Sequence, residues 1–293
     1  MDAHEQNPAA APAQAAPGQA AVTRVYAWRH VFLLQARSKS IDRQERPSSR
    51  LAATLFVAAG NPLRLQFNGQ APRDYHAVLF APGVKRERFE GAESDYTIVD
   101  IDIAHPAYEA MEPRIRWGEV LELPEDETRR LQDLVRPSFL QPLSCAEVHA
   151  LFRDLVSTVC GTAAWGGRRR DPRIYKALEL IRQLPFDELS LGVLARHTFL
   201  SGSRLRHLFR QEMGCTLSQY IRWASVHKAF GAWQPGTPFS AATAKAGFYD
   251  PAHFGHAVKE HFAQTPSAML KDAGIHFHRC DDDRGPADSP QPR

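Results

Sequence analysis

The sequence predicts an α+β protein, in which a β-barrel or β-sandwich precedes an all-α domain. Short runs of β-forming residues, separated by Gly, Pro, Asn and Asp, fill residues 23–112, and the apolar period then becomes helical. Residues 191–270 contain one helical pattern twice, at an offset of 49 positions. A chain of 293 residues is long enough for two domains that each bury a core.

Composition and charge exclude few classes of protein. The hydrophobic fraction of 43% is ordinary for a soluble protein, and the formal net charge is only +3. Residues 171–272 contain 12 Lys and Arg against 8 Asp and Glu, a balance of +4 that leaves −1 for the rest of the chain. Any attraction for phosphate is therefore local to this C-terminal part.

Residues 1–22 are mostly Ala, Pro and Gln, which offer too little apolar surface to offset the entropy lost on ordering. We expect a disordered tail there, although an arm that folds onto the C-terminal domain in one ligand state fits the same composition. The N-terminus lacks the basic region and apolar core of a signal peptide, and no apolar run approaches the ~20 residues of a membrane span. These features favour a cytoplasmic protein with no membrane partner.

Residues 23–112 are expected to form the β-domain. Val99, Ile101 and Ile103 alternate with Asp100 and Asp102, which predicts a strand with one buried and one solvated face. Several short strands with turn signals between them favour a barrel or a sandwich. The strands are expected at residues 25–28, 51–58, 63–67, 77–80 and 96–103.

Residues 113–160 are expected to be helical. Apolar residues recur there at i, i+3 and i+4, and the second set forms the sharper amphipathic stripe. Such a stripe fits packing on the β-domain and the contact of a homodimer equally well. The two sets are Leu131, Leu134 and Val135, then Val148, Leu151, Phe152, Leu155 and Val156.

Residues 161–170, with the sequence GTAAWGGRRR, predict a linker because they combine small residues, two adjacent glycines and three arginines. The arginines could contact phosphate, and an ordinary solvated linker fits the pattern equally well. Asp171 and Pro172 then predict the start of a helix, with an N-cap and a proline at the first helical position. At the other end, residues 273–293 are rich in Asp, Arg, Pro and Gln and are expected to form a disordered tail.

The repeated pattern predicts two helix-turn-helix units within residues 171–272. Each copy has a short helix (191–196 or 240–245), a tight turn, and a second helix that begins after a capping residue, Ser201 or Asp250. Residues 217–232 should form one long helix between the units. If the second helices enter successive major grooves on one side of DNA, this helix must hold them ~34 Å apart. In the first copy, an apolar stripe (Leu205, Leu208, Phe209) lies beside a polar stripe suited to a major groove (Ser203, Arg206, His207, Arg210).

Residues 171–270 resemble the DNA-binding domain of the AraC/XylS family of transcription regulators. The resemblance rests on the ordered pair of units, with Gly-Phe-Tyr-Asp at 247–250 and a Thr-Pro stop at 265–266. The other residues that carry it are Leu191, Leu194, Ala195, Leu200, Leu205, Leu208, Phe209, Gly214, Tyr220, Ile221, Ala229, Phe254 and Lys259. The sequence departs from the family pattern at Ser225, Val258, Ala263 and Leu270, which bears on phosphate contacts and on the core of the second unit.

The resemblance implies a sequence-specific activator that binds double-stranded DNA and contacts RNA polymerase. Arg206 is the residue best suited to guanine, because a guanidinium can bind O6 and N7 together for ~1–3 kcal/mol of discrimination. The second reading helix is poor in long side chains, so we expect it to contribute mainly phosphate contacts and shape readout. The family correspondence places base contacts at Ser203, Arg206, His207, Ala252, His253 and His256. From their charge and position, Arg204, Arg210 and Lys259 are expected to contact phosphate.

Two other interpretations of these residues remain open. The arginines could be solvated charges on a helix surface. His253 and His256 have the spacing of a metal-binding pair, but no third ligand is evident, so no metal site is expected.

The segment LFAPGVKRERF at 79–89, followed by DIDIAHPAY at 100–108, resembles the cupin-type sensor barrel that many AraC/XylS regulators carry. This likeness implies a pocket for a small-molecule effector. Arg64, Arg86 or Arg88 could pair with an anionic ligand, although solvated strand charges are the favoured interpretation.

Catalysis by a metal-bearing cupin is not expected. The histidines of the β-domain, His30, His76 and His105, are far apart in sequence, and Lys85 and Arg86 stand where a ligand would follow Pro-Gly. We therefore expect no catalytic residue and no cofactor. The alternatives are a constitutive regulator whose barrel only forms a homodimer, and a cupin enzyme fused to a DNA reader.

Four cysteines, Cys145, Cys160, Cys215 and Cys280, are scattered without C-x-x-C spacing. Reduced thiols are the simplest interpretation of this pattern. Neither a disulfide framework nor a zinc site is expected.

Overall fold

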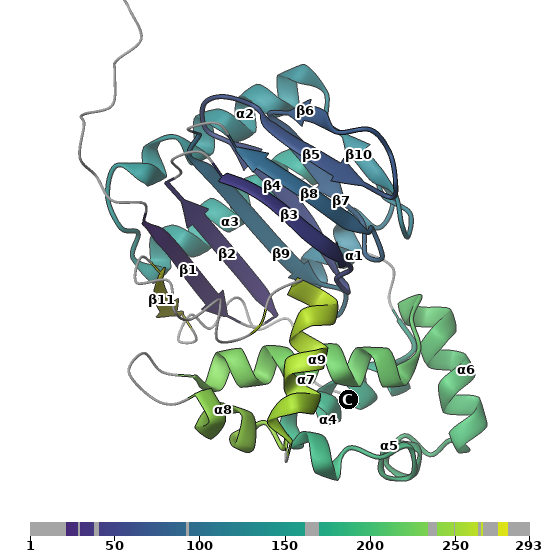
Figure 1. Ribbon diagram of the computed structural model, residues 1–293. Coiled ribbons are helices and arrows are strands. Elements are labelled where there is room, and N and C mark those ends of the chain that lie inside the picture. Colours follow the sequence, from purple (N-terminus) through teal and green to yellow (C-terminus); the bar gives the residue numbers. More distant parts are fainter. Residues whose placement is uncertain are drawn as a thin grey trace, which may run out of the picture.

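The computed structural model describes residues 22–28, 30–37, 41–91, 94–161, 170–233, 239–248, 250–262, 265 and 275–280. Among the expected features, those at 1–21, 162–169 and 281–293 lie outside these residues, as do Ala263 and Leu270. A sheet-rich N-terminal domain stands above a helical C-terminal domain (Figure 1), which confirms the predicted α+β class.

Two sheets face each other in the N-terminal domain. One has the strand order β10-β7-β4-β9-β2-β1-β11 and the other the order β3-β8-β5-β6. Aromatic side chains from both sheets fill the space between them, with ring centroids 4.5 Å apart for Phe67 and Phe80. The strands are β1 (Thr23–Trp28), β2 (Val31–Ala36), β3 (Ile41–Ser48), β4 (Ala52–Ala58), β5 (Leu63–Phe67), β6 (Arg73–Tyr75), β7 (Ala77–Phe80), β8 (Arg86–Gly91), β9 (Tyr96–Asp102), β10 (Val120–Glu122) and β11 (Ile275–Arg279).

Five strands, β1, β4, β5, β7 and β9, lie where the sequence predicts them. The pattern does not reveal β3 or β8, because IDRQERPS and RERFEG are mostly polar and lack apolar alternation. These two segments pair with each other in antiparallel fashion. Their strand conformation therefore comes from partners in the fold more than from local sequence.

The expectation of a solvated face on β9 is wrong. Asp100 and Asp102 are both buried, at 6% and 1% exposure. Arg50 and Arg86 form ion pairs with Asp100, and the Thr54 hydroxyl donates a hydrogen bond to it. The alternation in the sequence is real, but the second face is also covered, and its carboxylates have partners that offset their loss of water.

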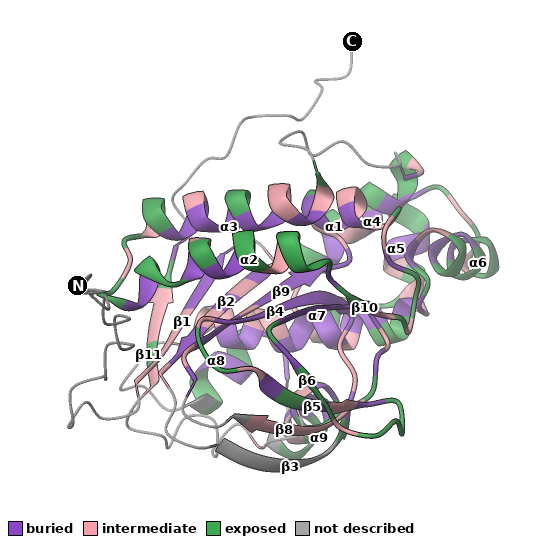
Figure 2. Cartoon of the chain, turned by 90° about the horizontal axis from the view of Figure 1, so that it is seen from above, coloured by how far each residue is buried: buried purple, intermediate pink, exposed green. Residues whose placement is uncertain are grey.

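Helices α2 (Glu125–Val135) and α3 (Cys145–Cys160) cover the outer face of the seven-stranded sheet (Figure 2). A capping box of Ser144 and Glu147 begins α3. The predicted stripe on α3 is buried within the chain, and so is that on α2 except for the half-buried Leu134. Both stripes are therefore intramolecular packing faces.

The C-terminal domain contains two helix-turn-helix units on either side of one long helix, as the repeat predicts. The Asp171 side chain accepts from the amide of Arg173 and begins the first helix. No helix of the described residues is both long and apolar enough to cross a bilayer. The helices are α4 (Pro172–Gln183), α5 (Leu191–His197), α6 (Gly202–Met213), α7 (Leu217–Ala232), α8 (Phe239–Lys245) and α9 (Pro251–Phe262).

Two expectations are contradicted near the C-terminus. Residues 275–279 form β11, which adds to the edge of the seven-stranded sheet in parallel with β1. Cys145 and Cys280 form a disulfide, whereas Cys160 and Cys215 are free. Sequence spacing does not reveal this bridge, because its cysteines are 135 positions apart and meet only through the fold.

Candidate DNA-binding surface

Helix α6 has one buried and one exposed face. Leu205 and Phe209 are fully buried, and the Phe209 ring lies 5.7 Å from the Tyr220 ring of α7. Ser203, Arg206 and His207 are exposed. Because these three residues are spaced at i, i+3 and i+4, they share one side of the helix. The structure therefore brings the predicted base-contacting residues of the first unit together on an open surface.

Helix α9 repeats this arrangement with shorter side chains. Phe254 and Val258 are buried in the core of the second unit. Ala252, His253 and His256 are exposed. The second unit thus has the same geometry as the first, and it presents imidazoles and a methyl group in place of a guanidinium.

Both candidate reading helices begin in the same way. The Ser201 hydroxyl accepts from the amide of Arg204 at 3.2 Å, and the Asp250 carboxylate accepts from the amide of Ala252 at 2.8 Å. Such caps satisfy amides that have no partner within the helix. The offset seen in the sequence is therefore a structural repeat.

A hollow of about 750 Å³ lies between the two units. Its polar wall combines Arg206, His207 and Arg210 of α6, Arg222 of α7 and His253 of α9. The described side chains that line it include no carboxylate, although Arg222 pairs with Glu260 at 3.3 Å outside the lining, so the arginines of α6 make this surface favourable for anions. The rest of its lining consists of two hydroxyl residues, Thr216 and Ser218, and five apolar residues, Phe186, Leu189, Leu191, Leu217 and Ile221. The predicted contact residues outside the hollow are Ser203, Arg204, Ala252, His256 and Lys259.

The long helix α7 is fastened to the barrel through Asp102. Its carboxylate accepts hydrogen bonds from the Tyr220 hydroxyl at 3.0 Å and from the Trp223 indole nitrogen at 2.7 Å. Burial raises the pKa of Asp102, while His30, the Ala104 amide and these two donors oppose the rise. A carboxylate at the end of a barrel strand therefore meets the helix that separates the two units.

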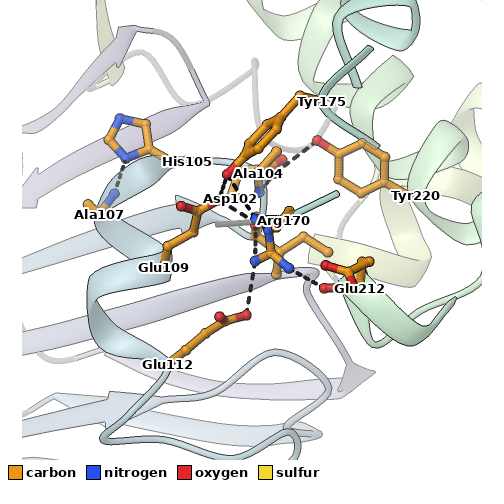
Figure 3. A network of polar contacts seen from close by, with 11 residues as sticks. Asp102, Ala104, His105, Ala107, Glu109, Glu112, Arg170, Tyr175, Glu212 and Tyr220 are labelled. Atoms are coloured by element: carbon orange, nitrogen blue, oxygen red, sulfur yellow. Dashed lines mark hydrogen bonds and ion pairs between the residues drawn. The ribbon is translucent and has the colours of Figure 1, made fainter. Parts of the chain in front are cut away.

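Arg170 forms a second junction between the domains (Figure 3). Its guanidinium donates to Glu109 at 3.2 Å, to Glu112 at 2.9 Å and to the Ile103 carbonyl at 3.2 Å, all in the barrel domain. It also donates to the carbonyl of Glu212, near the end of α6. Neither interpretation of the linker arginines holds for this one, because its side chain is only 2% exposed and has protein partners.

The end of α9 contacts the barrel directly. The Ser49 amide donates to the Glu260 carbonyl at 3.3 Å, and a His261 ring nitrogen lies 3.0 Å from the Ser49 carbonyl. The Arg50 guanidinium stacks over the Phe262 ring at 4.9 Å. The second reading helix is therefore restrained by the barrel at its C-terminal end.

The end of α6 contacts the barrel domain through Trp117. Gly214 ends this helix with a φ of 72°, a conformation that favours glycine. A Cβ atom at this position would lie 2.9 Å from the Trp117 ring. Glycine therefore serves both the helix end and the close approach of an indole.

The three barrel arginines considered as partners of an anionic effector, Arg64, Arg86 and Arg88, have partners within the chain. Arg64 is half exposed and pairs with Asp74 at 3.5 Å. Arg88 pairs with Glu90. The interpretation as solvated strand charges is wrong for Arg86, which is only 15% exposed and pairs with Asp100 inside the barrel.

The histidines of the barrel domain lie apart in the structure. His105 caps a helix, α1 (Pro106–Met111), by accepting from the amide of Ala107 at 3.1 Å. His76 lies 3.3 Å from the Gln132 side chain, and His30 lies 3.9 Å from Asp102. The described residues contain no cluster of three or more His, Cys, Asp or Glu side chains suited to a metal ion.

Sequence reasoning missed the contacts of Asp102, Arg170, Tyr220 and Trp223. One signal was present, because α7 has apolar residues around its whole circumference, and such a helix is buried on several sides. No local signal marks Arg170 as buried. Its position becomes clear only when the barrel and the first unit are placed together.

The comparisons with known proteins agree with this arrangement. A family model described as a helix-turn-helix domain matches residues 194–272. The chain is similar to the crystal structure of ToxT from Vibrio cholerae O395, with a TM-score of 0.52 and 11% identity, over 82% of this chain and 96% of that one. It is similar to ToxT from Vibrio cholerae O395 bound to (E)-4-(8-methylnaphthalen-1-yl)but-3-enoic acid, with a TM-score of 0.52 and 10% identity, over 86% and 99%. No curated protein matches. The likeness shows a fold shared over both domains.

Proposed function

We propose that the chain is a transcription regulator of the AraC/XylS type whose helices α6 and α9 read one DNA site together, and the helix-turn-helix match over residues 194–272 supports this proposal. The observation that carries this proposal is the pair of capped helices with buried apolar faces and exposed polar faces, on either side of a cationic hollow. The sugar-phosphate backbone of DNA is a polyanion. Its phosphates fit a cationic surface that lies between two helices able to enter neighbouring grooves.

The two helices have different roles in this proposal. On α6, Arg206 contacts guanine, and Ser203 and His207 contact neighbouring base edges. On α9, Ala252 contacts a thymine methyl group, and His253 and His256 contact base edges. Phosphate contacts from Arg204, Arg210 and Lys259 fix the position of the protein on DNA without reading its sequence.

We also propose that a small-molecule effector acts through the barrel. ToxT, whose fold is similar, has been solved with a naphthalenyl-butenoic acid bound. An effector changes DNA binding only if it has different affinities for two arrangements of the domains. The buried contacts of Asp102 and Arg170 support this route, because they join the barrel to α7 and to the end of α6. In this proposal the protein is an activator that lies with its DNA in the cytoplasm. When it is bound to DNA, it contacts RNA polymerase.

Site selection from random duplex DNA tests the proposed function. The full chain should be used at near-physiological salt, because the helical domain shares buried contacts with the barrel. We expect two enriched sequence blocks about one helical turn apart, the block under α6 being the better defined. Absence of DNA binding would overturn the function. Salt-sensitive binding without a consensus would overturn the assignment of sequence reading to α6.

A further inference from the structure

The chain returns to the barrel after the second DNA-binding unit. The family match ends at residue 272, and residues 275–279 then pair with β1 in a parallel register from Thr23–Ile275 to Ala27–Arg279. The amide of Cys280 donates to the Ala27 carbonyl at 3.0 Å. We call residues 275–280 the C-terminal strap. The helical domain is therefore joined to the barrel at both of its ends, through Arg170 before it and through the strap after it.

Side chains add to the backbone pairing of the strap. The His278 ring stacks on the Tyr26 ring of β1 at 4.9 Å. The Phe277 ring lies 6.0 Å from that of Trp233, which follows α7. The strap is a short strand at the edge of the sheet and, among the described strands, pairs with a neighbour on one side only. A covalent bond at its end would therefore decide how firmly the strap is held.

The Cys145–Cys280 disulfide is that covalent bond. It joins the end of the strap to the first residue of α3 and closes a loop that contains the whole helical domain. Cys280 is buried at 3% exposure, and Cys145 is half-buried. Cys145 is therefore the more accessible of the two bridged cysteines. Their Cα atoms are 5.2 Å apart, a separation ordinary for a disulfide.

We propose that Cys145 and Cys280 form a reversible redox site that controls the strap and, through it, DNA binding. A protein that acts on DNA shares the reducing compartment in which that DNA lies, so the DNA consequence rests on the proposed function. Disulfides in such compartments are rare, and those present are usually catalytic or redox-sensing. A bond that fastens a connection between two domains fits the sensing role.

The two free cysteines do not compete for this chemistry. Burial raises the pKa of the Cys215 thiol to about 12, so it has little thiolate at neutral pH. Burial also raises the pKa of the Cys160 thiol. Both shifts disfavour the reactive thiolate at the free cysteines.

The reductant is a cellular dithiol, and the exchange proceeds in two steps. A thiolate of the dithiol attacks the Cys145 sulfur, which breaks the S–S bond, forms a mixed disulfide and releases Cys280 as a thiolate. The second thiolate of the dithiol then attacks the mixed disulfide and releases Cys145. The dithiol leaves as a disulfide, and the two cysteines take up two protons to become thiols. Two electrons have passed to the protein.

Release of the strap acts on the second unit. Helix α9 is held at its C-terminal end by Ser49 and Arg50, and residues 275–279, later in the chain, are held by their pairing with β1. Two reading helices reach successive grooves only at a separation of ~34 Å, and a second unit tied to the barrel has less freedom to take up that position. We therefore expect the reduced protein to bind its site more tightly than the oxidised protein, by about 5-fold or more, the lower end of ordinary coupling between sites.

The test uses the full chain equilibrated in glutathione buffers of graded ratio. Acid quenching, alkylation and peptide mass spectrometry measure the fraction of Cys145–Cys280 disulfide, and amide hydrogen exchange measures protection of residues 275–279. Affinity is measured on the duplex recovered by site selection. Reduction should lower the protection of the strap and raise DNA affinity together. The variant with Cys145→Ser and Cys280→Ser should behave as the reduced protein in every buffer, while Cys160→Ser should keep the full response.

The readouts separate the two proposals. A folded protein that forms no Cys145–Cys280 bond under oxidising conditions, or one whose strap is equally protected in both states, overturns the redox site. Equal DNA affinity in both states overturns its role in regulation. If neither form binds DNA, the proposed function fails, and strap protection still decides whether the redox site exists.

Discussion

The two helix-turn-helix units have the same geometry. They differ in the side chains that their reading helices expose and in the contacts that hold the ends of those helices. Helix α6 presents Arg206 and His207, and its end is held by the guanidinium of Arg170. Helix α9 presents Ala252 and His253, and its end is held by the corner between β3 and β4. Both reading helices are therefore restrained at their C-terminal ends, and the clearer difference between the units is the length of the exposed side chains. This difference supports the proposal that the first unit specifies the sequence.

The largest expected effect is a loss of stability when the core of the first unit is disrupted. Phe209→Ala removes a fully buried ring between α6 and α7 and should lower the free energy of unfolding by about 3–5 kcal/mol. Denaturant unfolding monitored by circular dichroism measures this loss. The matched control is Phe199→Ala, since Phe199 is 94% exposed in the turn of the same unit and should change stability by no more than about 0.5 kcal/mol. Similar losses in both variants would contradict the assigned core.

The next largest effect concerns Asp102, which hydrogen-bonds α7 to the barrel. Helix α7 connects the two units, so this contact bears on both. Asp102→Ala leaves the Tyr220 hydroxyl and the Trp223 indole without their buried acceptor and should cost about 1–3 kcal/mol. Hydrogen exchange along α7 should rise in this variant. Unchanged protection of residues 217–232 would show that the contact does not hold the helix.

The same carboxylate predicts a dependence of stability on pH. Burial raises the pKa of Asp102 above its ordinary value of 3.8, so the folded chain holds this proton more tightly than the unfolded chain does. Its contribution is therefore greatest below the ordinary value and is lost as pH rises through the raised pKa. We expect the stability of wild type to fall relative to that of Asp102→Asn as pH increases from 4 toward 7 in paired unfolding titrations. A constant difference over that range would contradict the raised pKa.

The sequence predicted the helical domain well and the junction between domains poorly. The ends of α7 and the caps Ser201 and Asp250 follow from local rules of helix formation and from a repeat within the chain. The contacts of Arg170 depend on partners more than 40 residues away on either side, and no local pattern encodes them. Charged strands such as β3 were missed for the same reason. Whether the predicted contact residues touch DNA stays a prediction.

The proposed division of roles is sharpened by substitutions on the two reading helices. Arg206→Ala should lose about 1–3 kcal/mol of discrimination at one base pair, because a bidentate contact to guanine is removed. His253→Ala should relax preference less, in keeping with the shorter side chains that the second unit exposes. Competition binding against single-base variants of the selected site measures both. Arg153→Ala, an exposed arginine on α3 in the barrel domain, is the control. A uniform loss across sequences for Arg206→Ala would place this residue on phosphate.

The smallest expected effect tests the phosphate role of the second unit. Lys259 is exposed on α9, and its ammonium is proposed to neutralise one phosphate. Lys259→Ala should weaken binding by a similar factor for every sequence and reduce the slope of log affinity against log salt by about 1. Lys85→Ala, an exposed lysine of the barrel, should leave the slope unchanged. A loss confined to one base pair would instead make Lys259 a base-reading residue. The second unit would then share sequence recognition with the first.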